Sequence, residues 1–195
     1  LFRSTPGTGG FASGNITNIP NIDITLGTAG SPATFITGAL RIGDNATRVL
    51  SFANATDTLN IESGGFLRTN NNNGTTIGSV ANRGQLTAGG TSPAIGVTID
   101  LYLHLNSGQA NTTFTSNGVT TTTGQNNIFN SVIINNPANG GTPVRVVKDL
   151  GAGITFTAFN SYTGGTIING GTLLAASTGI ATGAAGAVTI PGDLT

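Results

Sequence analysis

The side chains best suited to catalysis in this 195-residue chain are its seven carboxylates. Two of them placed together could act as general acid and general base on a glycosidic bond. Each one stands alone in the sequence, and Asp44, Asp57 and Asp193 lie beside Asn, Gly or Thr, which is typical of residues that accept hydrogen bonds in turns. We therefore expect no catalytic site, with a carbohydrate-active enzyme as a remaining alternative. The seven residues are Asp23, Asp44, Asp57, Glu62, Asp100, Asp149 and Asp193.

The other residue types give little support for metal, cofactor or phosphate chemistry. His104 is the one histidine and cysteine is absent, so a two-histidine or thiolate zinc site is excluded. The Gly-Gly pairs that begin at Gly164 and Gly170 are not followed by the Gly-Lys-Ser/Thr of a phosphate-binding loop. His104 lies in the polar phase of the run LYLHL, which indicates an outward-facing strand histidine. The sequence thus predicts neither a bound metal nor a cofactor.

Charge and hydropathy limit the partners of the chain. Seven basic and seven acidic residues cancel, and only 7% of the residues are charged. No net field would attract nucleic acid or an anionic membrane surface. No apolar run reaches the roughly 18 residues that a membrane-spanning helix needs. We expect neither a nucleic-acid partner nor a membrane span.

The elements that position these residues should be strands. The chain has 33 Thr, 22 Asn and 31 Gly, but one Lys and one Glu, so strand and turn formers far outnumber the charged helix formers. Short runs alternate apolar with polar residues, as in residues 101–105, and are separated by Asn-Gly or Gly-Gly pairs that favour turns. The composition and the pattern predict an all-β fold, organised as a single domain over residues 1–195.

Self-similarity favours a β-solenoid, a parallel β-helix, over the alternative, a β-sandwich. Residues 58–69, 79–91 and 166–177 each read as a strand, a Gly-containing turn and a second strand, in proportions that suit one coil. At about 20 to 25 residues a coil, the chain would supply roughly eight to ten rungs. We expect mainly parallel strands over residues 95–190. Residues 1–50 carry no such motif and could be irregular or serve in capping or assembly.

Alternation also predicts which side chains fill the interior of the coils, because every second residue of a strand points to the same face. The predicted core residues are Leu101, Leu103, Leu105, Val132, Ile134, Val144, Val146, Ile154, Phe156, Ile167, Leu173 and Val188.

One segment, VKDLGAGITFTAFNSYTGGTIINGGTLLA at residues 147–175, carries a specific motif. It combines Val-Lys, a Gly-x-Gly turn, a Thr-rich strand, Asn-x-Tyr-x-Gly-Gly-Thr, an Ile-Asn strand end and Gly-Thr-Leu. This segment resembles the autotransporter-associated β-strand repeat, also called the passenger-associated transport repeat, of large secreted bacterial surface proteins. The matching residues are Val147, Lys148, Gly151, Gly153, Thr155, Thr157, Asn160, Tyr162, Gly164, Gly165, Thr166, Ile168, Asn169, Gly171, Thr172 and Leu173.

The resemblance implies a right-handed parallel β-helix exported to the bacterial cell surface, with an adhesive or structural role. We expect an extracellular structural protein, a segment of a surface fibre or filament. An adhesin that binds glycans is the alternative. No capping helix or charged cap is apparent at either end, and an open coil edge invites pairing. The expected partner is therefore a second copy, stacked end to end in a homo-oligomer or filament.

Overall fold

The computed structural model describes residues 11–19, 22–43, 46–69, 74–106, 111–116, 119–124 and 127–175. They form strands and one short 3₁₀ turn, η2 (Ala138–Gly140). Sheet 1 consists of β1 (Ile16–Ile19), β4 (Ala39–Ile42), β7 (Gly65–Arg68), β10 (Ile99–Leu105), β15 (Val144–Asp149) and β17 (Thr166–Ile168). Sheet 2 consists of β2 (Ile24–Leu26), β5 (Arg48–Phe52), β8 (Thr75–Ile77), β13 (Asn127–Phe129), β16 (Gly153–Phe156) and β18 (Thr172–Ala175). Sheet 3 consists of β3 (Thr34–Thr37), β6 (Thr58–Ile61), β9 (Gln85–Ala88) and β14 (Val132–Ile133).

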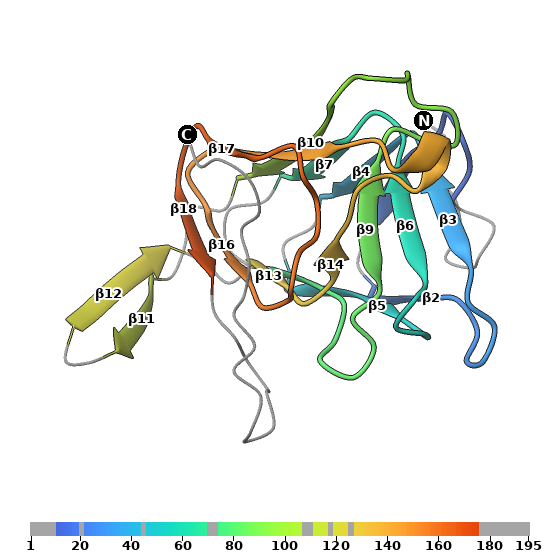
Figure 1. Cartoon of the computed structure of the whole chain (residues 1–195). Helices are drawn as coiled ribbons and strands as arrows, with labels where there is room; N and C mark the ends of the chain where they lie inside the picture. Colours follow the sequence, from blue (N-terminus) through green and yellow to red (C-terminus); the bar gives the residue numbers. More distant parts are fainter. Residues whose placement is uncertain are drawn as a thin grey trace, which may run out of the picture.

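The three sheets are parallel and the chain visits them in turn. It runs through β1, β2 and β3, then through β4, β5 and β6, and each strand pairs with its counterpart one circuit earlier. Each circuit is therefore one coil of a parallel β-helix, and the coils stack side by side (Figure 1). The predicted all-β solenoid is confirmed. The β-sandwich alternative, which requires two packed antiparallel sheets, is wrong.

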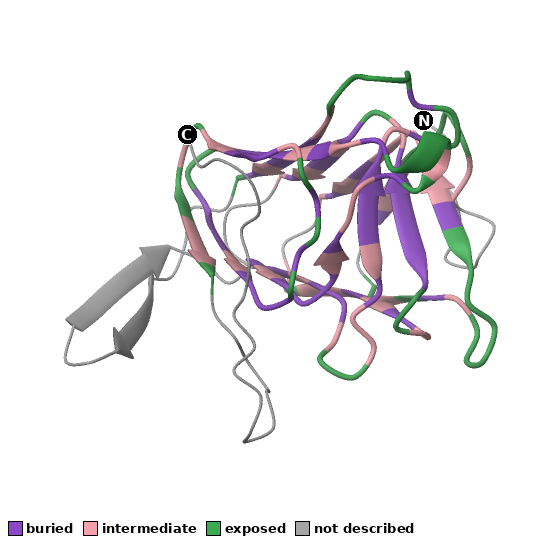
Figure 2. Cartoon of the chain, viewed as in Figure 1, coloured by how far each residue is buried: buried purple, intermediate pink, exposed green. Residues whose placement is uncertain are grey.

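Alternate residues of the strands fill the interior. Leu101, Leu103 and Leu105 are fully buried, whereas Tyr102 and His104 between them are half-buried and face outward. Buried residues of all three sheets form one hydrophobic cluster, and the buried segments run along all three walls (Figure 2). The predicted core residues that are confirmed as buried are Leu101, Leu103, Leu105, Val144, Val146, Ile154 and Phe156.

The predicted phase of β14 is wrong by one residue. The structure buries Ile133 completely and leaves Val132 and Ile134 half-buried. Ile133 pairs with the buried Leu86 of the preceding coil, which fixes its inward orientation. Four consecutive apolar or small residues in SVII give no alternation from which the phase could be read.

Two further core predictions fail near the last described coil. Ile167 pairs with the outward-facing Val147, so it lies on the outside of sheet 1 and is half-buried. Leu173 pairs with the buried Ile154 and packs against the core, but it is only half-buried, and among the described strands β16 is the one that pairs with its strand β18. Val188 lies outside the described residues.

Coils of unequal length give fewer rungs than the sequence predicts. Within the described residues, sheets 1 and 2 contain six strands each, against the eight to ten rungs expected for the whole chain. Val147 pairs with Ile167, 20 residues on, whereas Tyr102 pairs with Val147, 45 residues on. The long coil contains an antiparallel hairpin, β11 (Asn111–Ser116) and β12 (Val119–Gly124), which projects from the stack (Figure 1). The other described strands after residue 95 are parallel, as predicted.

The first 50 residues contain regular coil structure. Strands β1 to β4 and the start of β5 lie in this segment and pair in register with the coil that follows. Residues 1–10 are outside the described part of the chain. Within the described residues, no helix has the length and apolar character needed to cross a membrane.

Candidate functional site

Within the motif at residues 147–175, Asn160 hydrogen bonds with β14, the last described strand of sheet 3. The Oδ1 atom of Asn160 accepts the backbone N–H of Ile133 at 2.8 Å. The N–H of Ser161 donates to the carbonyl of Ile133 at 2.9 Å. The Asn-x-Tyr segment therefore pairs with β14 although it forms no strand itself. A side-chain amide takes the place of a backbone acceptor, as buried N–H groups require.

Tyr162 fills the interior at the corner that leads to β17. Its side chain is fully buried, and its hydroxyl lies 2.6 Å from Oγ1 of Thr166. Burial raises the pKa of Tyr162, and the hydrogen bond to Thr166 opposes this shift. A buried, neutral phenol with a satisfied hydroxyl is a packing group.

The glycines of the motif allow close approach between coils. A Cβ atom on Gly164 would lie 2.6 Å from the carbonyl oxygen of Val144. Gly171 has a φ of +73°, and a Cβ there would lie 2.3 Å from the carbonyl oxygen of Ala152. Neither backbone neighbour is a flexible group that could move aside. These glycines mark backbone contacts rather than a ligand-binding loop.

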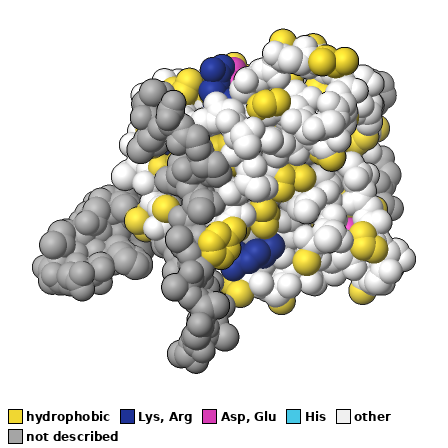
Figure 3. Space-filling view, viewed as in Figure 1, with side chains coloured by type: hydrophobic (Ala, Val, Ile, Leu, Met, Phe, Trp, Pro, Cys, Tyr) yellow, Lys and Arg dark blue, Asp and Glu magenta, His cyan; other side chains and the backbone are white. Residues whose placement is uncertain are grey.

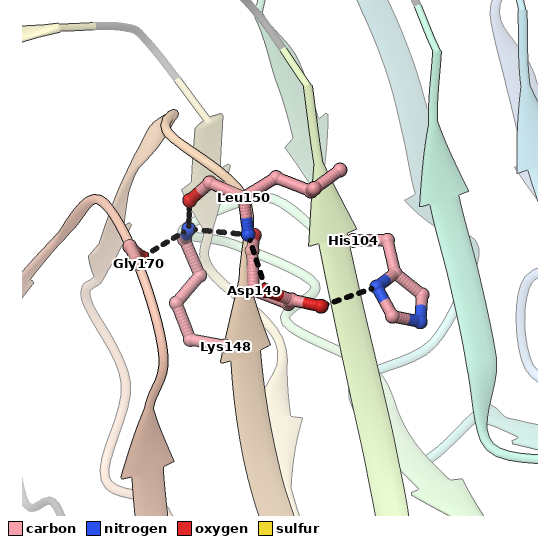
Figure 4. Close-up of polar contacts among 5 residues, drawn as sticks. All are labelled: His104, Lys148, Asp149, Leu150 and Gly170. Atoms are coloured by element: carbon pink, nitrogen blue, oxygen red, sulfur yellow. Dashed lines mark hydrogen bonds and ion pairs between the residues drawn. The ribbon is translucent and has the colours of Figure 1, made fainter.

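Lys148, near the C-terminal end of β15, is a buried cation in the inward phase of the strand. Its Nζ donates to the carbonyl oxygens of Asp149 at 2.9 Å, Leu150 at 2.7 Å and Gly170 at 2.9 Å (Figure 4). Three acceptors match the three N–H groups of an ammonium. Gly170 belongs to the next coil, so the lysine ties two coils together. Burial lowers the pKa of Lys148 from its ordinary 10.5 to about 8, with Asp149 opposing that shift.

The turn after β15 connects three coils. Leu150 has a φ of +65°, a conformation that residues other than glycine rarely adopt. The Oδ1 atom of Asp149 accepts the Leu150 N–H at 2.8 Å. Oδ2 of Asp149 lies 3.3 Å from Nδ1 of His104 on the preceding coil (Figure 4). His104 faces outward as predicted, and it is held by this contact.

The remaining motif residues also serve coil stacking. Val147 lies on the outer side of sheet 1 but is only 6% exposed. Gly153 and Thr172 pair in sheet 2, and Ile168 pairs with Lys148 in sheet 1. Gly151, in the turn after β15, has no described atom within 4 Å of the place where a Cβ would stand. The motif is spread over two coils and their corners. The remaining predicted residues, Gly165, Asn169 and Leu173, lie in the same two coils.

The described acidic residues bind across coils. Asp57 is fully buried; its Oδ1 accepts the Ala33 N–H of the preceding coil at 2.9 Å, and its Oδ2 accepts the Asn54 N–H at 2.8 Å. Glu62 accepts hydrogen bonds from the hydroxyl of Ser13 and the N–H of Gly14. The predicted turn role is therefore extended by contacts between coils.

Carboxylates do not gather into a metal site in the part of the chain that the structure describes. No group of three or more His, Cys, Asp or Glu side chains lies close enough there to hold a metal ion. Asp23 contacts Arg48 at 4.0 Å near the surface. Asp44 and Asp193 are outside the described residues.

A polar cluster occupies the outer face of sheet 1 across β10 and β15. Arg145 binds Asp100 through two nitrogens, Nε at 2.6 Å from Oδ1 and Nη2 at 3.0 Å from Oδ2. The hydroxyl of Tyr102 also donates to Oδ2 of Asp100, at 2.8 Å. The hydrogen bond from Arg145 lowers the pKa of Asp100, and the hydrogen bond to Asp100 raises the pKa of Tyr102. The rings of Tyr102 and His104 are parallel within 2°, with centroids 5.7 Å apart.

Sequence reasoning missed the arginines that bind backbone carbonyls between coils. Arg68 is fully buried and donates to the carbonyls of Ile42 and Ala46 at 3.3 and 2.7 Å. Arg83 donates to the carbonyl of Thr157 at 3.0 Å, two coils further on. For Arg68 a signal existed, because it occupies the inward phase of the strand GFLR.

Buried asparagines were also missed. Asn127 accepts the Thr75 N–H at 3.1 Å and donates to the carbonyl of Gly153 at 3.0 Å, so it joins three coils. Asn60 exchanges two hydrogen bonds of 2.9 Å with the backbone of Gly90. Asn in this chain therefore stabilises stacking as well as turns. For Asn127, the signal in the sequence was its position in the inward phase of β13.

No family model matches the chain, and neither a curated protein nor a solved structure matches it.

Proposed function

We propose that this chain is a structural segment of an extracellular bacterial surface fibre, in which β-helical coils continue from one subunit to the next. The motif at residues 147–175 supports the assignment to a secreted surface protein. Its residues serve coil-on-coil packing through Asn160, Tyr162 and Lys148. The observation that carries the proposal is the edge of β17, the last described strand of sheet 1.

The backbone of β17 has donors and acceptors on both sides. Gly165 and Asn169 hydrogen bond with β15 through the carbonyl of Gly165 and the N–H of Asn169. Backbone groups alternate in direction along a parallel strand, so Thr166 and Ile168 direct theirs away from β15. In the described part of the chain no strand pairs with that side. A further coil would satisfy these groups as β17 satisfies those of β15.

Apolar residues at this end would gain burial from a further coil. Ile168 and Leu173 occupy the inward phase of β17 and β18 but are half-buried, unlike Val146 and Ile154 one coil earlier. Burial contributes about 25 cal/mol for each Å² of apolar surface removed from water. Backbone pairing and apolar burial therefore favour the same partner, another coil.

Replacing Ile168 tests this edge. Ile168→Pro removes the N–H that points away from β15 at the sheet edge, and it removes no hydrogen bond to β15. Proline is tolerated at such edge positions. We expect Ile168→Pro to shorten or abolish filaments that the wild-type protein forms at high concentration. Light scattering and negative-stain electron microscopy give the measurement.

Ile168→Ala is the matched control, because it removes the side chain and keeps the N–H. It should weaken assembly less than Ile168→Pro does. Unfolding in urea should show that both variants remain folded. A wild-type protein that stays monomeric at high concentration, or a proline variant with unaltered filaments, would contradict stacking through β17.

A further inference from the structure

The three outer faces of the β-helix differ in their side chains. Among the described strand residues, every outward-facing charged side chain lies on sheet 1: Arg41, Asp100, Arg145 and Asp149. Tyr102 and His104 are on the same face. The outward positions of sheets 2 and 3 carry aliphatic, hydroxyl and amide side chains in the described strands. The view in Figure 3 shows a largely uncharged surface with few acidic or basic groups. One wall is therefore chemically distinct.

The polar groups on this wall form an ordered array. Asp100, Tyr102 and His104 project from β10 at every second residue, and Arg145 and Asp149 stand opposite the first and the last of them on β15. The array extends for about 13 Å along β10, at about 3.3 Å a residue for a parallel strand, and about 4.8 Å across the two strands. It is a row of groups rather than a single pair.

On one side, the neighbour of Tyr102 in the sheet is a glycine, which has no side chain to cover the ring. Across the ladder it pairs with Gly65 of β7, and among the described residues a Cβ built on Gly65 would meet only Ser63 and Ala39 within 4 Å. On the other side it pairs with Val147. The backbone at Gly65 therefore leaves space beside the ring of Tyr102, next to the carboxylate of Asp100 and the guanidinium of Arg145.

We propose that the outer face of β10 and β15 binds a neutral oligosaccharide. An aromatic side chain offers an apolar surface for the C–H groups of a sugar ring, and its edges remain polar. Carboxylate and guanidinium groups offer paired acceptors and donors that match neighbouring hydroxyls. A few placed polar groups around an aromatic surface are typical of small-molecule recognition.

Charge selects a neutral ligand over its competitors. Arg145 is ion-paired with Asp100, and Asp149 adds a second carboxylate beside His104, so the array gives no electrostatic attraction to an acidic ligand. A nucleic acid would require a positive surface, and the chain has no net charge. A protein partner would require a larger exposed apolar centre than this wall offers beside Tyr102, where Val147 is only 6% exposed and Ile167 is half-buried. This proposal is independent of end-to-end stacking, because the array lies on the side wall.

Chemical-shift mapping provides the test. The ¹⁵N-labelled protein is titrated separately with cellohexaose, mannohexaose, chitohexaose and the acidic trigalacturonic acid. We expect at least one neutral hexasaccharide to shift the amide signals of β10, β15 and Gly65, and the acidic probe to bind more weakly. No shift with any probe, shifts confined to sheets 2 and 3, or binding of the acidic probe alone would overturn the proposal.

Variants on two walls separate the site from non-specific effects. Tyr102→Ala should weaken binding at least about tenfold, which corresponds to about 1.4 kcal/mol. Tyr102→Phe keeps the ring and should retain most of the binding. Thr155→Ala, on the outer face of sheet 2, should bind as wild type. Unfolding curves for all three exclude loss of fold, and equal affinity of Tyr102→Ala and wild type would overturn the assignment.

Discussion

Individual polar side chains set how one coil sits on the next, and Asp57 shows why their chemistry matters. The contacts of its carboxylate are all with donors: the N–H of Ala33, and the N–H and side-chain amide of Asn54. A carboxylate accepts at both oxygens, whereas an amide would turn an NH₂ group toward one of these donors. An asparagine, although it has nearly the same shape, could therefore not replace Asp57 without losing one of these hydrogen bonds.

Asp57→Asn should lower the free energy of unfolding by about 1 to 3 kcal/mol, because a buried donor loses its acceptor. Urea unfolding followed by circular dichroism measures the change. Asp23→Asn is the control, since the Asp23 side chain is 62% exposed, and its effect should stay within about 0.5 kcal/mol. Equal effects of the two substitutions would show that the cross-coil hydrogen bonds of Asp57 do not stabilise the fold.

Two glycines of the motif should respond differently to the same substitution. Gly164→Ala places a methyl group 2.6 Å from the backbone oxygen of Val144 and should destabilise the protein by about 1 to 3 kcal/mol. Gly151→Ala meets open space and should be neutral or slightly stabilising. Thermal unfolding of both variants checks the difference, and a tolerated Gly164→Ala would mean that the coils can separate at this corner.

Lys148 should make stability depend on pH in the alkaline range. Its pKa is about 8 in the folded protein and 10.5 in the unfolded chain, so between these values the unfolded chain binds more protons. Stability then rises with pH through this window, whereas well below pH 8 Lys148 is protonated in both states and adds no pH dependence. The unfolding free energy of the wild type minus that of Lys148→Met should therefore increase from pH 8 to 10. A decrease would show that the three carbonyl acceptors hold the proton more strongly than burial expels it.

At the scale of elements, the hairpin β11–β12 is an insertion at one corner of the coil. In the following coil, Asp149 and Ile154, the partners of His104 and Asn127, are separated by a short turn. Replacing residues 107–126 by Ser-Gly would give the long coil the same spacing. We expect this variant to keep the circular dichroism spectrum of the β-helix and a similar unfolding midpoint. Loss of cooperative unfolding would show that the hairpin is needed to fold the stack.

The sequence predicted strands where alternation is clear and failed where it is not. The run LYLHL gives the phase of β10 without ambiguity, whereas SVII leaves the phase of β14 open until its pairing with β9 is known. The number of rungs could not be predicted, because an insertion and a coil have the same local composition. The outer array was also hidden. Asp100 and Arg145 are 45 residues apart and meet only through the register of two parallel strands.

At the scale of the whole molecule, the properties of the stack follow from its lack of charge. Seven basic and seven acidic residues are spread over 195, and several of them lie inside the coils or pair on one wall. Association between ends would therefore depend on backbone hydrogen bonds and apolar contact. Both are short-range interactions that dissolved salt does not screen.

The expected solution behaviour follows directly. Raising sodium chloride from about 0.05 to 0.5 M shortens the screening length several-fold, yet it should change the concentration at which filaments appear only slightly. Ammonium sulfate should promote assembly and urea should oppose it, because the first strengthens apolar burial and the second solvates apolar and peptide groups. Sedimentation of filaments across the three series gives the measurement, with Ile168→Pro as the non-assembling reference. Filaments that dissolve in sodium chloride alone would indicate ion pairs between subunits, and the bond between copies would then differ from the bond between coils.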